Sequence, residues 1–125
     1  MIQFLQSLFR WQPKPAEHVE ILLSDESIGV WNLAQNATTE LRWNEIDRIT
    51  IVTTDQGPFF EDVFFVFEGR GTAIIVTHED AVRLDLYEAI VAHLTGIDHE
   101  QSIAAMKCTD NNSFIMFERQ HALDR

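Results

Sequence analysis

The stretch from Trp43 to Thr77 constrains the fold more than any other part of the chain. It contains three runs rich in β-branched and aromatic residues, which suit the pleated surface of a sheet. Gly57 and Pro58 separate the first two runs, and the short turn from Gly69 to Gly71 separates the last two. A turn of that length joins antiparallel neighbours, so we expect the last two strands to form a hairpin.

The middle run, Asp62 to Glu68, is apolar on both faces. Alternation along a strand puts Phe65 and Phe67 on one side and Phe64 and Val66 on the other. We therefore expect this strand at the centre of a sheet that is covered on both sides. The cover is either a helix of this chain or a second subunit.

Three shorter strands are expected before this stretch and one after it. The turns between consecutive strands are short, which indicates a meander that curls into a bent sheet or partly open barrel. These strands are Val19 to Leu23, Ile28 to Leu33, Thr38 to Trp43 and Phe114 to Phe117.

Capping residues indicate two helices after the sheet. Thr77 is a suitable N-cap for a long helix that ends at Gly96. Asp98 is a suitable N-cap for a short helix from His99 to about Met106. The residues expected to face the sheet are Leu84, Tyr87, Val91 and Leu94 in the long helix and Ile103 and Met106 in the short one.

The predicted fold class is therefore α+β: a curled antiparallel sheet of six to seven strands with one long helix packed on it and short N- and C-terminal helices. The N-terminal helix is expected within residues 1–12, where Ile2, Leu5, Leu8 and Phe9 form one apolar stripe. This segment lacks the basic start and the unbroken apolar run of a signal peptide, and it is too short to span a membrane. We expect it to dock on the domain or on a partner rather than to anchor in a membrane interface, because its one Arg attracts anionic lipid weakly. A single domain follows over residues 16–118, and residues 119–125 are expected to form a polar tail.

The chain is strongly acidic, with a formal net charge of −11 over 125 residues. Negative charge repels phosphate backbones and anionic lipid headgroups, so neither nucleic acid nor a membrane is an expected partner. The charge suits either a plain solvated surface or contact with a protein partner, which would be a basic protein or a second copy of this chain. The single cysteine, Cys108, leaves no disulfide within the chain and fits a reducing, cytoplasmic location.

The weak candidates for a polar site are Asp55, Glu61, Asp62 and His78. Three carboxylates around one turn could ligate a divalent cation, but their spacing matches no calcium loop and Asp is also an ordinary turn residue. The chain has no glycine-rich phosphate loop, no G-x-S-x-G sequence and no closely spaced zinc-binding histidines. We therefore assign no catalytic, cofactor-binding or metal-binding residue, and a binding protein is favoured over an enzyme.

Several aromatic and apolar residues are candidates for an interface. If they are exposed, they mark a contact surface, and if they are buried, they belong to the core. These residues are Phe4, Leu8, Trp11, Phe59, Phe60 and Phe64.

The strand order and the spacing Trp43-x-x-Ile46-x-x-Ile49, followed by two strands and a helix, resemble a bacterial pleckstrin-homology-like domain over about Val19 to Thr95. The resemblance implies a curled sheet with one packed helix. The first turn, Ser24 to Ser27, carries acidic residues where phosphoinositide-binding members of that family carry Lys and Arg. Lipid-headgroup binding therefore does not carry over to this chain.

The run TTDQGPFFEDVF, from Thr53 to Phe64, is similar to a group of small uncharacterised bacterial proteins, as are the later runs GIDHEQSIAAM and FIMFER. This similarity implies a bacterial cytoplasmic protein and supplies no activity.

Three functional hypotheses follow. The first is a non-enzymatic protein-interaction domain that associates with itself. The second is an acidic immunity- or antitoxin-like inhibitor of a basic toxin. The third is a small enzyme or metal-binding protein that uses the region of Asp55, Glu61, Asp62 and His78.

Overall fold

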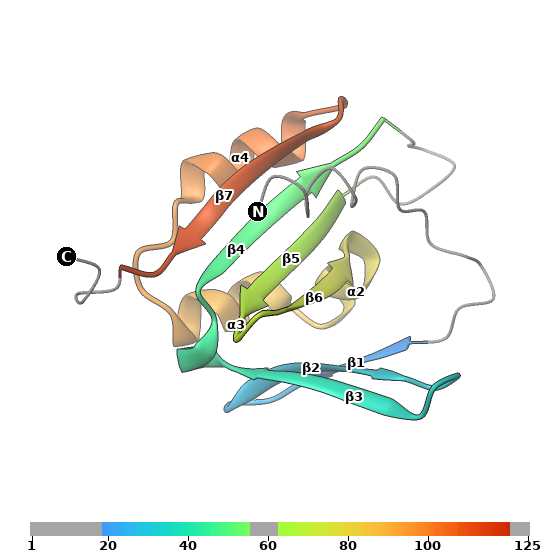
Figure 1. Ribbon diagram of the computed structural model, residues 1–125. Helices are drawn as coiled ribbons and strands as arrows, with labels where there is room; N and C mark the ends of the chain where they lie inside the picture. The colour runs from blue at the N-terminus through green and yellow to red at the C-terminus, as the bar shows by residue number, and fades with distance from the viewer. Residues whose placement is uncertain (1–18, 56–62, 121–125) are drawn as a thin grey trace.

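The computed structural model describes residues 19–55 and 63–120. In these ranges the chain has an α+β fold in which strands form two antiparallel sheets (Figure 1). The first sheet has the order β1-β2-β3, and the second has the order β6-β5-β4-β7. The strands are β1 (Val19–Leu23), β2 (Ser27–Asn32), β3 (Ala37–Arg42), β4 (Arg48–Thr53), β5 (Val63–Gly69), β6 (Thr72–Thr77) and β7 (Asn112–Glu118).

The prediction of one curled sheet is wrong at the connection from β3 to β4. The chain leaves β3 through a 3₁₀ turn, η1 (Trp43–Glu45), and β4 then pairs with β5 and β7 instead of β3. Trp43 is only 5% exposed, and its indole N–H donates to the carbonyl of Ser24 at 3.1 Å. Burying this large side chain turns the chain out of the first sheet, so two consecutive strands end in different sheets.

The predicted hairpin between β5 and β6 is confirmed. Its loop consists of Arg70 and Gly71, whose φ angles of 53° and 72° are those of a two-residue turn that matches the twist of the strands. The last strand, β7, pairs with the other side of β4, and a β-bulge lies where the register shifts between Ile49 and Thr50. The C-terminal strand therefore completes the sheet beside a strand far away in the sequence.

Between β6 and β7 the chain forms three α-helices: α2 (His78–Arg83), α3 (Leu86–His93) and α4 (His99–Lys107). Both predicted N-caps are confirmed, because the Thr77 hydroxyl accepts from the Asp80 N–H at 3.2 Å and Asp98 accepts from the Gln101 N–H at 3.1 Å. The prediction of one long helix is wrong. Asp85 adopts a left-handed conformation (φ 53°, ψ 47°), which separates α2 from α3.

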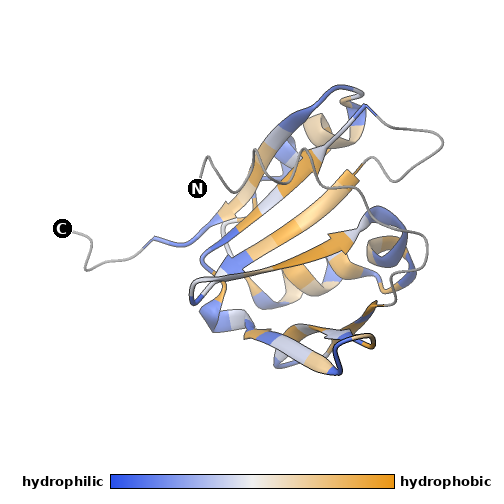
Figure 2. Ribbon diagram, turned by 45° about the vertical axis from the view of Figure 1, so that its right-hand side comes forward, coloured by the Kyte–Doolittle hydropathy of each residue, from blue (hydrophilic) through white to orange (hydrophobic). Residues whose placement is uncertain are grey.

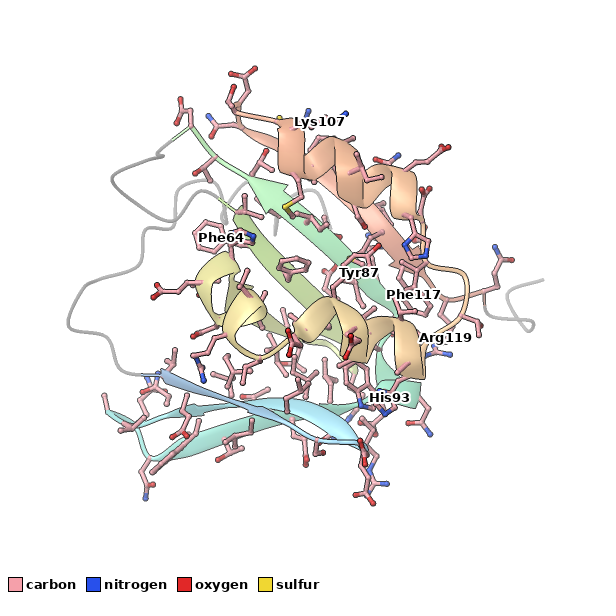
Figure 3. The ribbon with its side chains drawn as sticks, turned by 180° about the vertical axis from the view of Figure 1, so that it is seen from behind. Phe64, Tyr87, His93, Lys107, Phe117 and Arg119 are labelled. Carbon is pink, nitrogen blue, oxygen red and sulfur yellow. The ribbon has the colours of Figure 1, made fainter. Side chains whose placement is uncertain are left out.

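One apolar core joins both sheets and all three helices. The helices lie on one side of the four-stranded sheet (Figures 1 and 3), and the strands of that sheet are hydrophobic along most of their length (Figure 2). The core contains Ile28 and Leu41 from the first sheet, Phe67 from the second and Leu86 and Ile90 from α3, all without exposed surface.

Three residues that were expected to be buried are exposed instead. Val91 is 44% exposed, Ile103 55% and Met106 45%. In α4 the residues that face the sheet are the small Ser102 and Ala105, which allow the helix to approach β7 closely and turn the larger side chains outward. Among the helices that the structure describes, none is both long and apolar enough to cross a membrane.

Candidate functional site

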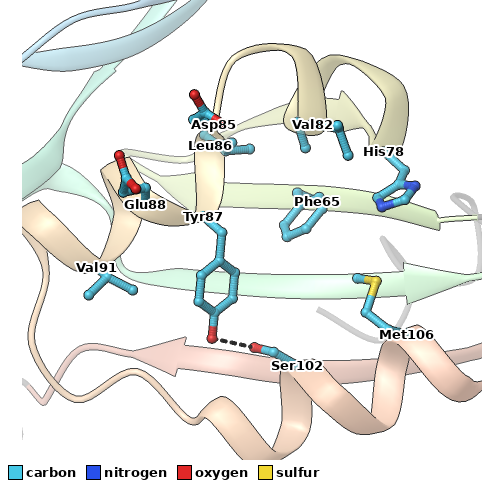
Figure 4. Close-up of a pocket in the computed structure, with 11 residues that line it drawn as sticks. Phe65, His78, Val82, Asp85, Leu86, Tyr87, Glu88, Val91, Ser102 and Met106 are labelled. Atoms are coloured by element: carbon cyan, nitrogen blue, oxygen red, sulfur yellow. Dashed lines mark hydrogen bonds between the residues drawn. The ribbon is translucent and has the colours of Figure 1, made fainter.

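An apolar groove of about 620 Å³ lies between α2 and α3 on one side and α4 on the other (Figure 4). Phe65 of β5 lies between the helices at the bottom of the groove and is 3% exposed. Val82 of α2 and Met106 of α4 point toward this space from its two sides. The groove therefore has a buried floor on the inner side of the four-stranded sheet and exposed apolar walls on the helices.

Large apolar side chains in this groove remain in contact with solvent. Val82 is 64% exposed, Met106 45% and Val91 44%. Single exposed apolar residues are common on protein surfaces, but several around one hollow mark a binding surface. The break at Asp85 gives α2 its own direction, so the wall of the groove is made from two short helices.

Tyr87 crosses the groove and links its two walls (Figure 4). Its hydroxyl lies 3.3 Å from the Ser102 hydroxyl and 2.6 Å from Nδ1 of His99, both on α4. Ser102 is buried, and its hydroxyl also donates to the carbonyl of Asp98 at 3.3 Å. These polar groups satisfy one another, so their arrangement fixes the distance between α3 and α4 and does not present a nucleophile.

The charged groups of the groove are acidic. Asp85 and Glu88 line it and are exposed, and no Lys or Arg is among the described residues of the lining. His78, at the start of α2, is half-buried beside Phe65 (Figure 4). The described lining thus combines an apolar floor with negative charge and contributes no fixed positive charge.

The residues predicted as a polar site are only partly within the described ranges. His78 lines the groove, whereas Asp55 is exposed just after the end of β4, where its N–H donates to Oδ1 of Asn111 at 3.2 Å. Glu61 and Asp62 lie outside the described residues. Within the ranges that are described, no group of three or more His, Cys, Asp or Glu side chains is arranged to hold a metal ion.

The candidates for an interface fall mostly outside these ranges as well. Phe64 is described and is 3% exposed, on the side of β5 that faces away from the helices. The candidates outside the described residues are Phe4, Leu8, Trp11, Phe59 and Phe60. The lone thiol of Cys108 is half-buried and accepts from the Thr53 hydroxyl at 3.5 Å, which ties the segment after α4 to β4.

The groove residues that sequence reasoning missed are Val82, Val91 and Met106. Helical periodicity assigned Val91 and Met106 to the core because it assumed one continuous helix and a close fit of every apolar residue. The one local signal was Asp85, because Asp is among the few residue types that adopt the left-handed conformation readily.

A second hollow, of about 630 Å³, lies where the two sheets meet. The rings of Trp43 and His93 stack there with centroids 4.7 Å apart. Arg119 donates to the carbonyls of Ile46 at 2.9 Å and Trp43 at 3.0 Å. Since the polar groups of Trp43 and Arg119 are engaged in holding the junction, the apolar groove is the better candidate for binding. Arg119, the first residue of the predicted tail, is anchored.

Burial raises the pKa of Glu68 above its ordinary value of 4.5, and the nearby Arg48 guanidinium opposes this effect. Arg48 itself is paired with Glu118 on the neighbouring strand. One carboxylate oxygen of Glu68 is buried without a hydrogen-bond partner in the described part of the chain. Glu68 faces away from the groove, on the same side of β5 as Val66.

Comparisons of the chain with protein-family models, curated proteins and solved structures give no match. The groove therefore has to be interpreted from its own geometry and charge.

Proposed function

We propose that this protein is a non-enzymatic interaction domain that binds an amphipathic, basic helix of a partner protein in the groove between α2–α3 and α4. The observation that carries the proposal is the exposure of Val82, Val91 and Met106 around one hollow. Helices bind such grooves through apolar residues spaced three to four positions apart. An open apolar groove with few polar groups suits this kind of ligand.

Charge supports a basic partner over a second copy of this chain. The net charge of −11 repels another copy at long range and attracts a basic protein. Asp85 and Glu88 place negative charge beside the apolar surface, where Lys or Arg on the flanks of a bound helix would be neutralised. An inhibitor of a basic protein, such as the predicted immunity- or antitoxin-like role, is one specific form of this proposal.

The direct test is titration with a synthetic helical peptide of leucine and lysine, with leucines on one face. We expect binding in the micromolar range, and at least a tenfold loss of affinity in the variant Val82→Asn/Met106→Gln, because both changes remove exposed apolar surface without changing charge. The matched control is Leu33→Asn/Ile115→Asn, which changes two exposed apolar residues outside the groove. Affinity should fall as salt increases.

The proposal is wrong if a scrambled peptide of the same composition binds equally well or if the groove variant binds as the parent protein does. Light scattering on the free protein measures its molar mass and so tests the alternative, which is self-association. A dimer that the same groove variant abolishes would make a second copy the occupant and would contradict the basic partner.

A further inference from the structure

The hollow of about 630 Å³ at the junction of the two sheets shares no described lining residue with the apolar groove. Its volume is within the range of sites that bind small organic molecules. Trp43, Leu94 and Phe117, all buried, contribute apolar surface to its lining. Figure 3 shows Phe117, Arg119 and His93 at the same end of the domain. The hollow therefore combines apolar surface with a positive charge, which the described lining of the groove lacks.

The guanidinium of Arg119 holds the junction with one edge and leaves a second edge for a ligand. Its Nε–H donates to the carbonyl of Ile46, and one N–H of Nη2 donates to the carbonyl of Trp43. Since arginine has five N–H donors in a planar fork, the edge between Nη1 and Nη2 keeps one N–H on each nitrogen. Two parallel N–H groups of this kind match the two oxygens of a carboxylate. Within the described ranges no carboxylate pairs with Arg119, whereas three other arginines have such a partner.

His93 supplies a second polar group to the hollow. Its Nδ1 lies 2.9 Å from the carbonyl of Ala89, one turn earlier in α3. A carbonyl oxygen can only accept, so Nδ1 carries a proton and Nε2 of the neutral ring keeps a lone pair, directed away from the helix. Stacking on Trp43 fixes the plane of the imidazole. Since no residue in the described part of the chain donates to Nε2, this nitrogen can accept a hydrogen bond from a ligand.

We propose that the hollow binds a small aromatic hydroxy acid, whose carboxylate pairs with Arg119 and whose hydroxyl donates to Nε2 of His93. The ring of the ligand packs against the apolar surface of Trp43 and Phe117, because aromatic rings gain from contact with other rings. The site is separate from the groove, so this inference does not rest on the proposed function.

The charges around the hollow favour a carboxylate over a phosphate. Arg119 contributes a single positive charge, which one carboxylate neutralises. Glu118 also lines the hollow, and its own carboxylate is paired with Arg48. A phosphate group carries about two negative charges at neutral pH, so one of them would remain unpaired next to Glu118. The net charge of −11 on the whole chain also acts against a ligand with two negative charges.

The test is titration of the full chain with the positional isomers of hydroxybenzoate, followed by ¹H–¹⁵N NMR. We expect shifts of the Trp43 indole N–H and of the backbone amides of Thr95 and Gly96, which line the hollow. The preferred isomer should bind about fivefold more tightly than benzoate, which lacks the hydroxyl. The hydroxybenzamide of the same substitution pattern lacks the negative charge and should bind at least tenfold more weakly than the acid.

Two variants separate the two contacts of the ligand. Arg119→Lys keeps the positive charge but removes the pair of parallel donors, so the affinity for the preferred isomer should fall at least tenfold. The matched control Arg83→Lys changes an exposed arginine outside the hollow and should leave the affinity within twofold. His93→Phe keeps a ring against Trp43 but removes the acceptor, so the preferred isomer should then bind no more tightly than benzoate.

Several results would overturn the inference. These are the absence of shifts with every isomer, shifts at Val82 and Met106 of the groove instead, and an amide that binds as tightly as the acid. Phenyl phosphate that binds more tightly than every isomer would contradict the choice of a carboxylate. An unchanged affinity in Arg119→Lys, or a preference over benzoate that persists in His93→Phe, would contradict the assigned contacts. If Arg119→Lys does not fold, the comparison of acid and amide on the native sequence still decides.

Discussion

The two sheets of this protein differ in how their strands use alternation. Along β3 of the three-stranded sheet, Leu41 is buried while its neighbours Glu40 and Arg42 are exposed. Along β5 of the four-stranded sheet, every residue from Val63 to Phe67 is buried. Figure 2 shows the same contrast, with mixed hydropathy in the first sheet and a long hydrophobic stretch along β5 in the second. A strand with alternating burial lies at the surface of the fold, and a uniformly buried strand lies in the middle.

This contrast also explains where binding surfaces can form. A sheet with one apolar face needs only one covering layer, and the core of the domain provides it. The four-stranded sheet needs cover on both sides, and the three helices on its inner side leave the groove above Phe65. The candidate site therefore lies where the helices that cover the sheet leave their own apolar side chains exposed to solvent.

The largest expected effect comes from removing volume from the inner side of the four-stranded sheet. Phe67 has no exposed surface, so Phe67→Ala should lower the free energy of unfolding by about 3–5 kcal/mol. Leu33→Ala, at a residue 46% exposed after β2, should cost less than about 0.5 kcal/mol. Urea denaturation monitored by circular dichroism measures both, and equal costs would contradict the assigned core.

The junction between the sheets should be the next most sensitive place. A Cβ on Gly69 of β5 would lie 2.1 Å from the carbonyl oxygen of Glu45 in η1, so Gly69→Ala must displace backbone. We expect a cost of about 2–3 kcal/mol in unfolding free energy. Gly71→Ala is the control, because a Cβ there meets nothing and only the φ of 72° is unfavourable, at about 1 kcal/mol. A smaller cost at Gly69 than at Gly71 would show that the two sheets do not approach so closely.

A polar substitution of constant shape tests whether the four-stranded sheet is also buried on the face that points away from the helices. Val66→Thr places a hydroxyl where the parent side chain has no exposed surface and should cost about 1–2 kcal/mol. The matched change Val19→Thr, at a residue of β1 that is 43% exposed, should change the stability by less than about 0.5 kcal/mol. Thermal and urea denaturation of the two variants measure this difference. If Val66→Thr is as mild as Val19→Thr, the four-stranded sheet has only one covered face.

The smallest expected effect is a change in pH dependence at Glu68. Because its pKa is raised in the folded state, the folded protein binds this proton more tightly than the unfolded chain does. The contribution of Glu68 to stability is therefore fully present below its unfolded pKa near 4.5 and is lost as pH rises through the higher folded pKa. Glu68→Gln should gain stability relative to the parent as pH rises through that window, measured by urea denaturation at several pH values. A constant difference from pH 4 to pH 7 would contradict this assignment.

Local sequence signals predicted much of the fold. The strands, the β5–β6 hairpin and the caps at Thr77 and Asp98 follow from side-chain preferences over a few residues, and all are present. The groove was not predicted, although His78 was singled out for a different reason. Exposure of Val82, Val91 and Met106 depends on how α2, α3 and α4 are placed against one another, and periodicity within one helix does not contain that information.

The sequence alone determined the α+β class, the acidic charge and the two apolar faces of β5, because these depend on residue type and on alternation within a strand. Tertiary structure decided that β3 and β4 belong to different sheets, that β7 pairs with β4 and that the helix breaks at Asp85. In each case the local conformational preference of a few residues competes with the free energy gained by burying residues that are far apart in the chain. Trp43 illustrates the reason: its indole ring packs against His93 of α3, and that contact exists only after the whole domain has folded.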